Sequence, residues 1–224
     1  MSSERFGFEA VVFDFDGLIL ETEHADYESW ARLYRDHGEN LSMDLWGTVI
    51  GRGHKFFDPF EELERRLGRS LPEREALLAG RRAHHQEMIA VLEVLPGVVE
   101  VIEAARALGL KLGVASSSSR GWVTGHLQRL GLTGWDCIRT RDDVVEAKPD
   151  PELYLSVCAC MGVEPARSVA LEDSANGIRA AKAAGMKCIA VPNPMTAALD
   201  LGAADLRVDS LASLSLPVML ERLQ

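Results

Sequence analysis

The chain lacks the features that mark membrane-spanning, secreted and nucleic-acid-binding proteins. No apolar run reaches the ~20 residues that a transmembrane helix needs, and residues 1–5 lead into the first strand without a signal-peptide apolar stretch. A formal charge of −10 disfavours general nucleic-acid binding, which normally uses a basic face. We therefore expect a soluble, cytoplasmic, monomeric protein that binds neither membrane nor nucleic acid.

Cysteine is also scarce. The 224 residues include only four, none of them in a CxxC pair: Cys137, Cys158, Cys160 and Cys188. Two of these, Cys158 and Cys160, would lie about 200° apart on a helix and so would not face each other. Reduced thiols are the expected state in a cytoplasmic protein.

What the chain does contain is a regular alternation of short apolar runs and amphipathic stretches. The predicted strands occupy residues 10–13, 111–115, 137–140, 168–171 and 187–191. The predicted helices between them occupy residues 98–108, 123–130, 152–161 and 175–184. Such alternation is typical of βαβ units and of a parallel sheet covered by helices on both faces. The sequence therefore predicts an α/β fold with a Rossmann-like core.

One segment interrupts this alternation. Residues 22–93 contain no strand pattern but three amphipathic stretches, at residues 24–36, 57–67 and 72–92. We expect an all-helical domain over residues 22–93, inserted into a core made of residues 1–21 and 94–224.

Two acidic pairs follow predicted strands. Asp14 and Asp16 come directly after the first strand, and Glu172 and Asp173 follow the strand at 168–171. Ligands of parallel sheets bind at the carboxyl ends of the strands, so these carboxylates are expected to meet in one crevice. Close carboxylates repel unless a cation lies between them, and hard oxygen ligands suit Mg²⁺. The pairs predict a catalytic metal site.

The first acidic pair also has the groups needed for covalent catalysis. Asp14 can attack an electrophile as a nucleophile, and Asp16 can exchange protons with the entering or leaving oxygen. Gly17 would let the backbone approach a substrate closely. The alternative for these three residues is a solvated turn, which Asp and Gly also favour.

Two further segments can bind an anion. Ser116, Ser117 and Ser118 follow a predicted strand, where hydroxyls and backbone N–H groups can cradle a phosphate. Lys148 lies in a turn fixed by two prolines and can present a point charge to a phosphate oxygen. Alternatively, the serines form a capping turn and Lys148 is an ordinary surface lysine. Residues 172–173 could likewise be no more than a helix N-terminal cap.

Taken together, these segments resemble the motifs of the haloacid-dehalogenase-like phosphohydrolases. Residues 14–17 look like the first motif of the family, Ser116 the second, Lys148 the third and residues 172–173 the fourth. The helical insertion resembles the small α-helical cap of these enzymes.

The resemblance implies a role for each residue. Asp14 would be phosphorylated, Asp16 would act as general acid and then base, and Ser116 and Lys148 would hold the phosphoryl group. It also implies a Mg²⁺ site. The ligands would be Asp173, Glu172, Asp14 and the carbonyl of Asp16.

Within the family, the pattern is most similar to the subgroup of β-phosphoglucomutase-like enzymes and sugar-phosphate phosphatases. Four positions depart from it: Leu18 stands where Thr or Val is frequent, Glu21 where Asp is frequent, Asp26 where mutases commonly carry His, and His54 where the mutase cap carries Arg. A mutase needs a second fixed cationic site, for which Arg52 and His54 are the candidates, although both could lie in a solvated loop. These departures favour a Mg²⁺-dependent phosphatase of small phosphorylated metabolites, such as sugar phosphates. A phosphomutase and a non-catalytic phosphoacceptor module are the alternatives.

Overall fold

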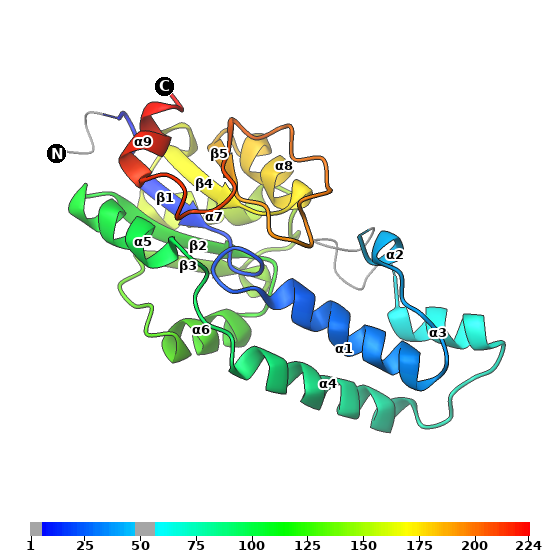
Figure 1. Cartoon of the computed structure of the whole chain (residues 1–224). Helices are drawn as coiled ribbons and strands as arrows, with labels where there is room; N and C mark the ends of the chain where they lie inside the picture. Colours follow the sequence, from blue (N-terminus) through cyan, green and yellow to red (C-terminus); the bar gives the residue numbers. More distant parts are fainter. Residues whose placement is uncertain (1–5, 48–56) are drawn as a thin grey trace. The chain divides into compact units, whose positions relative to one another are not determined.

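The computed structural model describes residues 6–47 and 57–224, and the chain divides into two compact units (Figure 1). The first unit consists of Met1–Leu20 and Glu93–Gln224, and the second is the continuous segment Glu21–Leu92. The second unit is therefore an insertion in the chain of the first, placed after the first strand.

The first unit is built on a six-stranded parallel sheet in the order β3-β2-β1-β4-β5-β6. Its strands are β1 (Ala10–Phe13), β2 (Lys111–Ser116), β3 (Cys137–Thr140), β4 (Ser168–Glu172), β5 (Lys187–Ala190) and β6 (Leu206–Arg207). The central strand β1 pairs with β2 and β4, so Phe13 lies opposite both Val114 and Leu171. The predicted α/β fold is confirmed, and the register brings the ends of β1, β2 and β4 to the same edge of the sheet.

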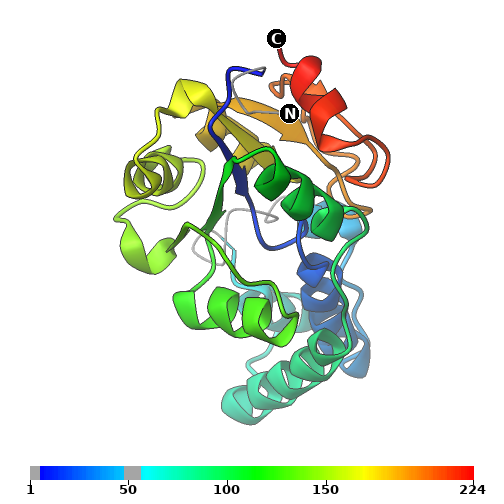
Figure 2. The same cartoon turned by 90° about the vertical axis from the view of Figure 1, so that its left-hand side faces the viewer.

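Helices cover both faces of this sheet. They are α5 (Val98–Ala107), α6 (Arg120–Arg129), α7 (Glu152–Met161), α8 (Ala175–Ala183) and α9 (Leu216–Glu221), with short 3₁₀ helices at η2 (Arg141–Asp143) and η3 (Pro165–Arg167). α7 and α8 pack on one face, and α5 and α9 lie together on the other (Figure 2). α7 has its predicted bounds and ends at Gly162, whose φ of 64° is left-handed. A glycine favours this conformation because it has no Cβ.

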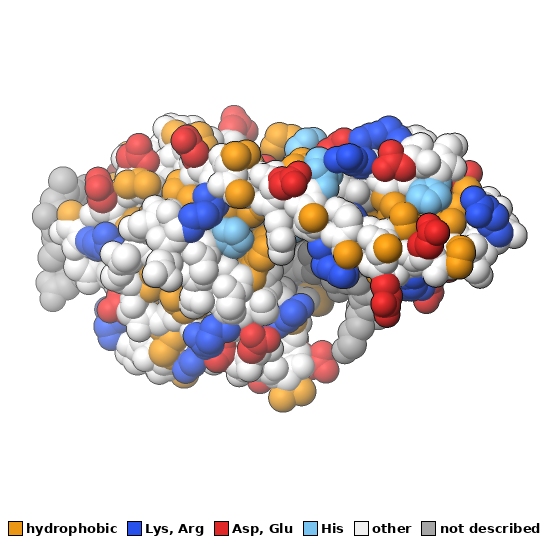
Figure 3. All heavy atoms as spheres, turned by 90° about the horizontal axis from the view of Figure 1, so that it is seen from below, with side chains coloured by type: hydrophobic (Ala, Val, Ile, Leu, Met, Phe, Trp, Pro, Cys, Tyr) orange, Lys and Arg blue, Asp and Glu red, His pale blue; other side chains and the backbone are white. Residues whose placement is uncertain are grey.

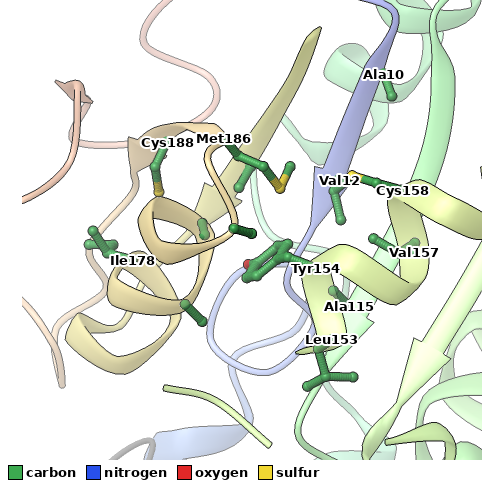
Figure 4. Close-up of a cluster of buried hydrophobic side chains, with 14 of the residues drawn as sticks. Ala10, Val12, Ala115, Leu153, Tyr154, Val157, Cys158, Ile178, Met186 and Cys188 are labelled. Atoms are coloured by element: carbon green, nitrogen blue, oxygen red, sulfur yellow. The ribbon is translucent and has the colours of Figure 1, made fainter. Parts of the chain in front are cut away.

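The face covered by α7 and α8 holds a large cluster of buried side chains (Figure 4). Ala10 and Val12 belong to it because alternate residues of β1 point to the same face. Tyr154 of α7 lies in the same cluster and is fully buried. A buried tyrosine needs a hydrogen-bond partner for its hydroxyl group, and Tyr154 finds one in the site described below.

The second unit is all-helical over its described residues. Its helices are α1 (Thr22–Asp36), α2 (Met43–Gly47), α3 (Pro59–Leu67) and α4 (Arg74–Ala90). α1 and α4 pack along each other, and Arg81 of α4 donates to the Asp26 carboxylate of α1 at 2.7 Å. α3 begins where the Asp58 carboxylate accepts a hydrogen bond from the Phe60 N–H at 2.8 Å. α4 begins two residues later than predicted, because residues 72–73 form a turn.

The cysteines correct one prediction. Cys137 of β3 and Cys160 of α7 form a disulfide, with Cα atoms 6.2 Å apart, so the expectation of reduced thiols is wrong for this pair. Cys158 and Cys188 are free and buried. The spacing of Cys137 and Cys160 in the sequence could not reveal the disulfide, because only the packing of α7 on β3 brings these two residues together.

Within the two described ranges, the helices are too short or too polar to cross a membrane. Acidic and basic side chains are interspersed on the face drawn in Figure 3. The net charge of −10 is therefore not gathered into a single acidic patch on that face.

Candidate active site

The candidate site begins at the carboxyl ends of β1 and β4, where the sheet register brings three acidic residues together. Asp14 directly follows β1, and its backbone N–H donates to the Leu171 carbonyl of β4 at 3.0 Å. Glu172 ends β4, and Asp173 follows it. All three carboxylate residues are buried.

Lys148 links Asp14 to Glu172. Its Nζ donates to Asp14 Oδ1 at 2.5 Å and to Glu172 Oε1 at 2.6 Å. Tyr154 donates its hydroxyl hydrogen to the same Glu172 oxygen at 2.7 Å. The Lys148 side chain is 4% exposed, so this ammonium group is buried with its partners. Lys148 is therefore not an ordinary surface lysine.

Burial has opposite effects on the two partners of this ion pair. Desolvation raises the pKa of Asp14 to about 8 although Lys148 opposes the shift, and the charges of Glu172 and Asp16 add to it. Burial by itself would lower the pKa of Lys148, but Asp14 and Glu172 outweigh it and raise that pKa above its ordinary value. The cluster has more carboxylates than one lysine can neutralise, which favours the binding of a further cation.

The carboxylates are arranged as a metal site would require. Asp14, Glu172 and Asp173 each offer an oxygen, and these atoms lie within 4.8 Å of one another. Buried oxygen ligands of this kind suit Mg²⁺. Both Glu172 oxygens already accept hydrogen bonds from the protein, Oε1 as above and Oε2 from the Ser174 hydroxyl at 3.1 Å. Glu172 thus also serves to orient Lys148.

Gly17 and Asn193 set the position of Asp173. Asn193 donates through Nδ2 to Asp173 Oδ2 at 2.8 Å and to the Gly17 carbonyl at 3.1 Å. Gly17 has a φ of 83°, and a Cβ there would collide with Asp173 Oδ2. Only glycine therefore lets this loop approach the Asp173 carboxylate so closely.

Asp16 has a different environment from the other acidic residues. Its Oδ2 accepts hydrogen bonds from the hydroxyls of Ser118 at 2.6 Å and Ser116 at 3.4 Å. Its Oδ1 accepts from the indole N–H of Trp122 at 2.9 Å. The Asp16 side chain is thus oriented toward the turn after β2, and it is not among the carboxylates grouped around the possible metal site.

The remaining predicted residues divide into two sets. The Ser117 hydroxyl is buried and has no hydrogen-bond partner among the described residues, so it can donate to a ligand. Arg52 and His54 lie outside the described residues. The structure therefore brings together Asp14, Lys148, Glu172 and Asp173. Asp16, in the loop after β1, instead accepts hydrogen bonds from Ser116 and Ser118 at the end of β2.

Three residues of the site were not predicted from the sequence. Tyr154 has the pattern of a core aromatic residue on α7. No motif in the sequence near Trp122 predicts that its indole N–H donates a hydrogen bond in the site. Asn193 follows β5 closely, so the rule that polar groups after parallel strands face the site could have identified it.

Comparison with known proteins shows the family. Residues 8–185 match the haloacid dehalogenase-like hydrolases. The chain belongs to this family. A haloacid dehalogenase-like hydrolase from Deinococcus radiodurans R1, solved with bound phosphate and sodium, has a TM-score of 0.78 and 26% identity, and the match covers 96% of each chain. The family predicted from the motifs is therefore confirmed.

Two curated relatives of this haloacid dehalogenase-like hydrolase have names that refer to phosphatases. "Putative phosphatase YhcW" of Bacillus subtilis (strain 168) is 45% identical over 216 residues, which are 96% of this chain and 97% of that protein. The phosphorylated carbohydrates phosphatase of Thermotoga maritima is 32% identical over 186 residues, which are 81% of this chain and 83% of that protein.

Proposed function

We propose that this haloacid dehalogenase-like hydrolase is a Mg²⁺-dependent phosphatase of small phosphorylated metabolites, with sugar phosphates as the expected substrates. The observation that carries the proposal is the buried ion pair of Lys148 Nζ and Asp14 Oδ1, 2.5 Å apart, beside two further buried carboxylates. A phosphate monoester is anionic, so a carboxylate can approach it only where positive charge offsets the repulsion. Lys148 supplies part of that charge.

Asp14 is the proposed nucleophile. One of its oxygens attacks phosphorus, the bond from phosphorus to the ester oxygen breaks, and Asp16 transfers a proton to the departing oxygen. Asp16 then accepts a proton from the water molecule that attacks the aspartyl phosphate. This second step releases inorganic phosphate and restores the Asp14 carboxylate.

Asp14, Asp173, Glu172 and the carbonyl of Asp16 are the proposed Mg²⁺ ligands. When bound, the ion would supply the additional positive charge that the phosphoryl oxygens require. Lys148 would hold one of those oxygens. The turn after β2 would contact the others, and the Ser117 hydroxyl, buried and without a partner, is suited to such a contact.

Sugar phosphates are proposed because the phosphatase of Thermotoga maritima is named for phosphorylated carbohydrates. The helical unit Glu21–Leu92 is proposed as the cap that selects the organic part of the substrate, with Arg52 and His54 as candidate contacts. A cytoplasmic location and a monomeric state stay predictions.

The test is phosphate release from a panel of sugar phosphates, measured with Mg²⁺ and with a chelator. Metal-dependent release over many turnovers would support the proposal. Glucose 1-phosphate that becomes glucose 6-phosphate without release would identify a phosphomutase instead. One phosphate taken up per chain, followed by no turnover, would identify a phosphoacceptor module.

A further inference from the structure

We propose that Trp122 is a positioning residue, whose indole N–H holds the Asp16 carboxylate in a fixed orientation for catalysis. The inference rests on the proposed function, in which Asp16 is the acid and base. Its structural basis is the 2.9 Å hydrogen bond from Trp122 Nε1 to Asp16 Oδ1.

The two oxygens of Asp16 have chemically different neighbours. An indole N–H can only donate, whereas a serine hydroxyl can donate or accept. Oδ1 faces the Trp122 indole, and Oδ2 faces the Ser118 hydroxyl at 2.6 Å. The carboxylate is therefore held at both of its oxygens, by the indole N–H at Oδ1 and by hydroxyl groups at Oδ2.

The indole is held in place by its own contacts. Trp122 lies in the first turn of α6, and its backbone N–H donates to the Ser119 hydroxyl that caps this helix. His126, one turn further along α6, packs edge-on against the indole with ring centroids 4.4 Å apart. The His126 ring also stacks on Phe15, the residue between the two catalytic aspartates, at 6.3 Å. The position of Trp122 is thus set by the start of α6, and its indole is packed by the His126 ring.

This arrangement predicts a specific defect in a Trp122→Phe variant, which keeps an aromatic ring but loses the N–H donor. Without its fixed orientation, Asp16 should protonate a departing oxygen less efficiently. For a sugar phosphate, which leaves as a poorly stabilised alkoxide, kcat/KM should fall about 10- to 100-fold. For p-nitrophenyl phosphate, whose phenolate leaves without a proton, kcat/KM should change little.

Trp135→Phe is the matched control. Trp135 also donates its indole N–H, to the Leu132 carbonyl at 3.1 Å, and packs edge-on against Phe13 at 5.5 Å. This variant should leave the ratio of kcat/KM for the two substrates unchanged. An equal loss for both substrates in Trp122→Phe, or no loss for either, would overturn the proposal.

A second measurement does not depend on activity or on the folding of a Trp122 variant. The indole N–H resonances of ¹⁵N-labelled protein should respond to Asp16→Asn at Trp122 and remain in place at Trp135. An unmoved Trp122 resonance would overturn the positioning role. If the Trp122 resonance shifts but the wild-type protein hydrolyses no phosphate ester, the hydrogen bond is supported and the proposed function is refuted. The bond would then have no role in catalysis.

Discussion

Each of the two units contains a hydrogen-bonded ion pair, and the basic partner of the pair differs greatly in exposure between them. In the sheet unit, the Lys148, Asp14 and Glu172 side chains are 4%, 9% and 0% exposed. In the helical unit, the Arg65 side chain that pairs with Glu62 is 71% exposed. The ammonium group of Lys148 is therefore desolvated, whereas the guanidinium group of Arg65 is largely hydrated.

This difference in exposure indicates different roles: buried charges are expected to take part in chemistry, and exposed charges to keep the protein soluble. Desolvating an ion costs several kcal/mol, and replacing a buried pair by apolar groups is often neutral or stabilising. Exposed pairs contribute about 0–1 kcal/mol, so their loss or gain is tolerated. A lysine buried among carboxylates is thus better explained by a need for positive charge at that place than by a gain in stability.

The largest expected effect is on activity and lies in the sheet unit. Asp14→Asn should lower turnover at least ~10⁴-fold, because a covalent mechanism cannot proceed without its nucleophile. The fold should survive, since burial already raises the pKa of Asp14 to about 8 and so disfavours its charged form. Phosphate release and the thermal midpoint would be measured together, with the exposed Asp209→Asn as control. Retained turnover in Asp14→Asn would refute the assignment.

The next largest effect is on stability, and it is tested by one variant in each of the two units. Lys148→Met leaves Asp14 and Glu172 buried without their shared cation and should cost about 3–5 kcal/mol. Arg65→Met removes only the hydrated partner of Glu62 and should cost about 0–1 kcal/mol. Denaturant unfolding of both variants without Mg²⁺ checks this. Equal losses in the two variants would mean that burial does not distinguish the pairs.

The disulfide should stabilise the sheet unit alone. All four cysteines belong to that unit, and Cys137 and Cys160 close a loop that carries Lys148 and Tyr154. Loop-closure entropy predicts a stabilisation of about 3 kcal/mol for a bridge of this span. Reduction should therefore lower the unfolding midpoint of the sheet unit, with little effect on the helical unit. A Cys137→Ser, Cys160→Ser double variant should no longer respond to the reductant, and a continued response would contradict the prediction.

The disulfide also illustrates which features a sequence reveals. Patterns along one element are local, so β1 and α7 were predicted with their observed bounds. β6 and α9 were missed because two and six residues are too few to show a period. Contacts between elements leave no such pattern, and the Cys137–Cys160 pair depends on α7 packing against β3.

The same distinction, between patterns within one element and contacts between elements, holds within the site. The acidic residues after β1 and β4 could be expected to meet, because parallel strands end at a common edge. The orientation of their side chains could not be predicted. It depends on Tyr154, Asn193 and Trp122, each of which reaches a carboxylate from a different element.

The smallest expected effect concerns the ion pairs of the helical unit at low pH. Hydrogen bonds from Arg65 and Arg66 lower the pKa of Glu62 from 4.5 to about 2. A folded-state pKa below the unfolded value means that the carboxylate stabilises the fold above about pH 4.5 and that this contribution is lost as the pH falls toward 2. Glu62→Gln should therefore lower the unfolding midpoint of the helical unit at pH 6 and have less effect near pH 2.5. The exposed Glu75→Gln is the control and should show a smaller dependence on pH. A constant difference between wild type and Glu62→Gln across this range would show that hydration screens the pair at every pH.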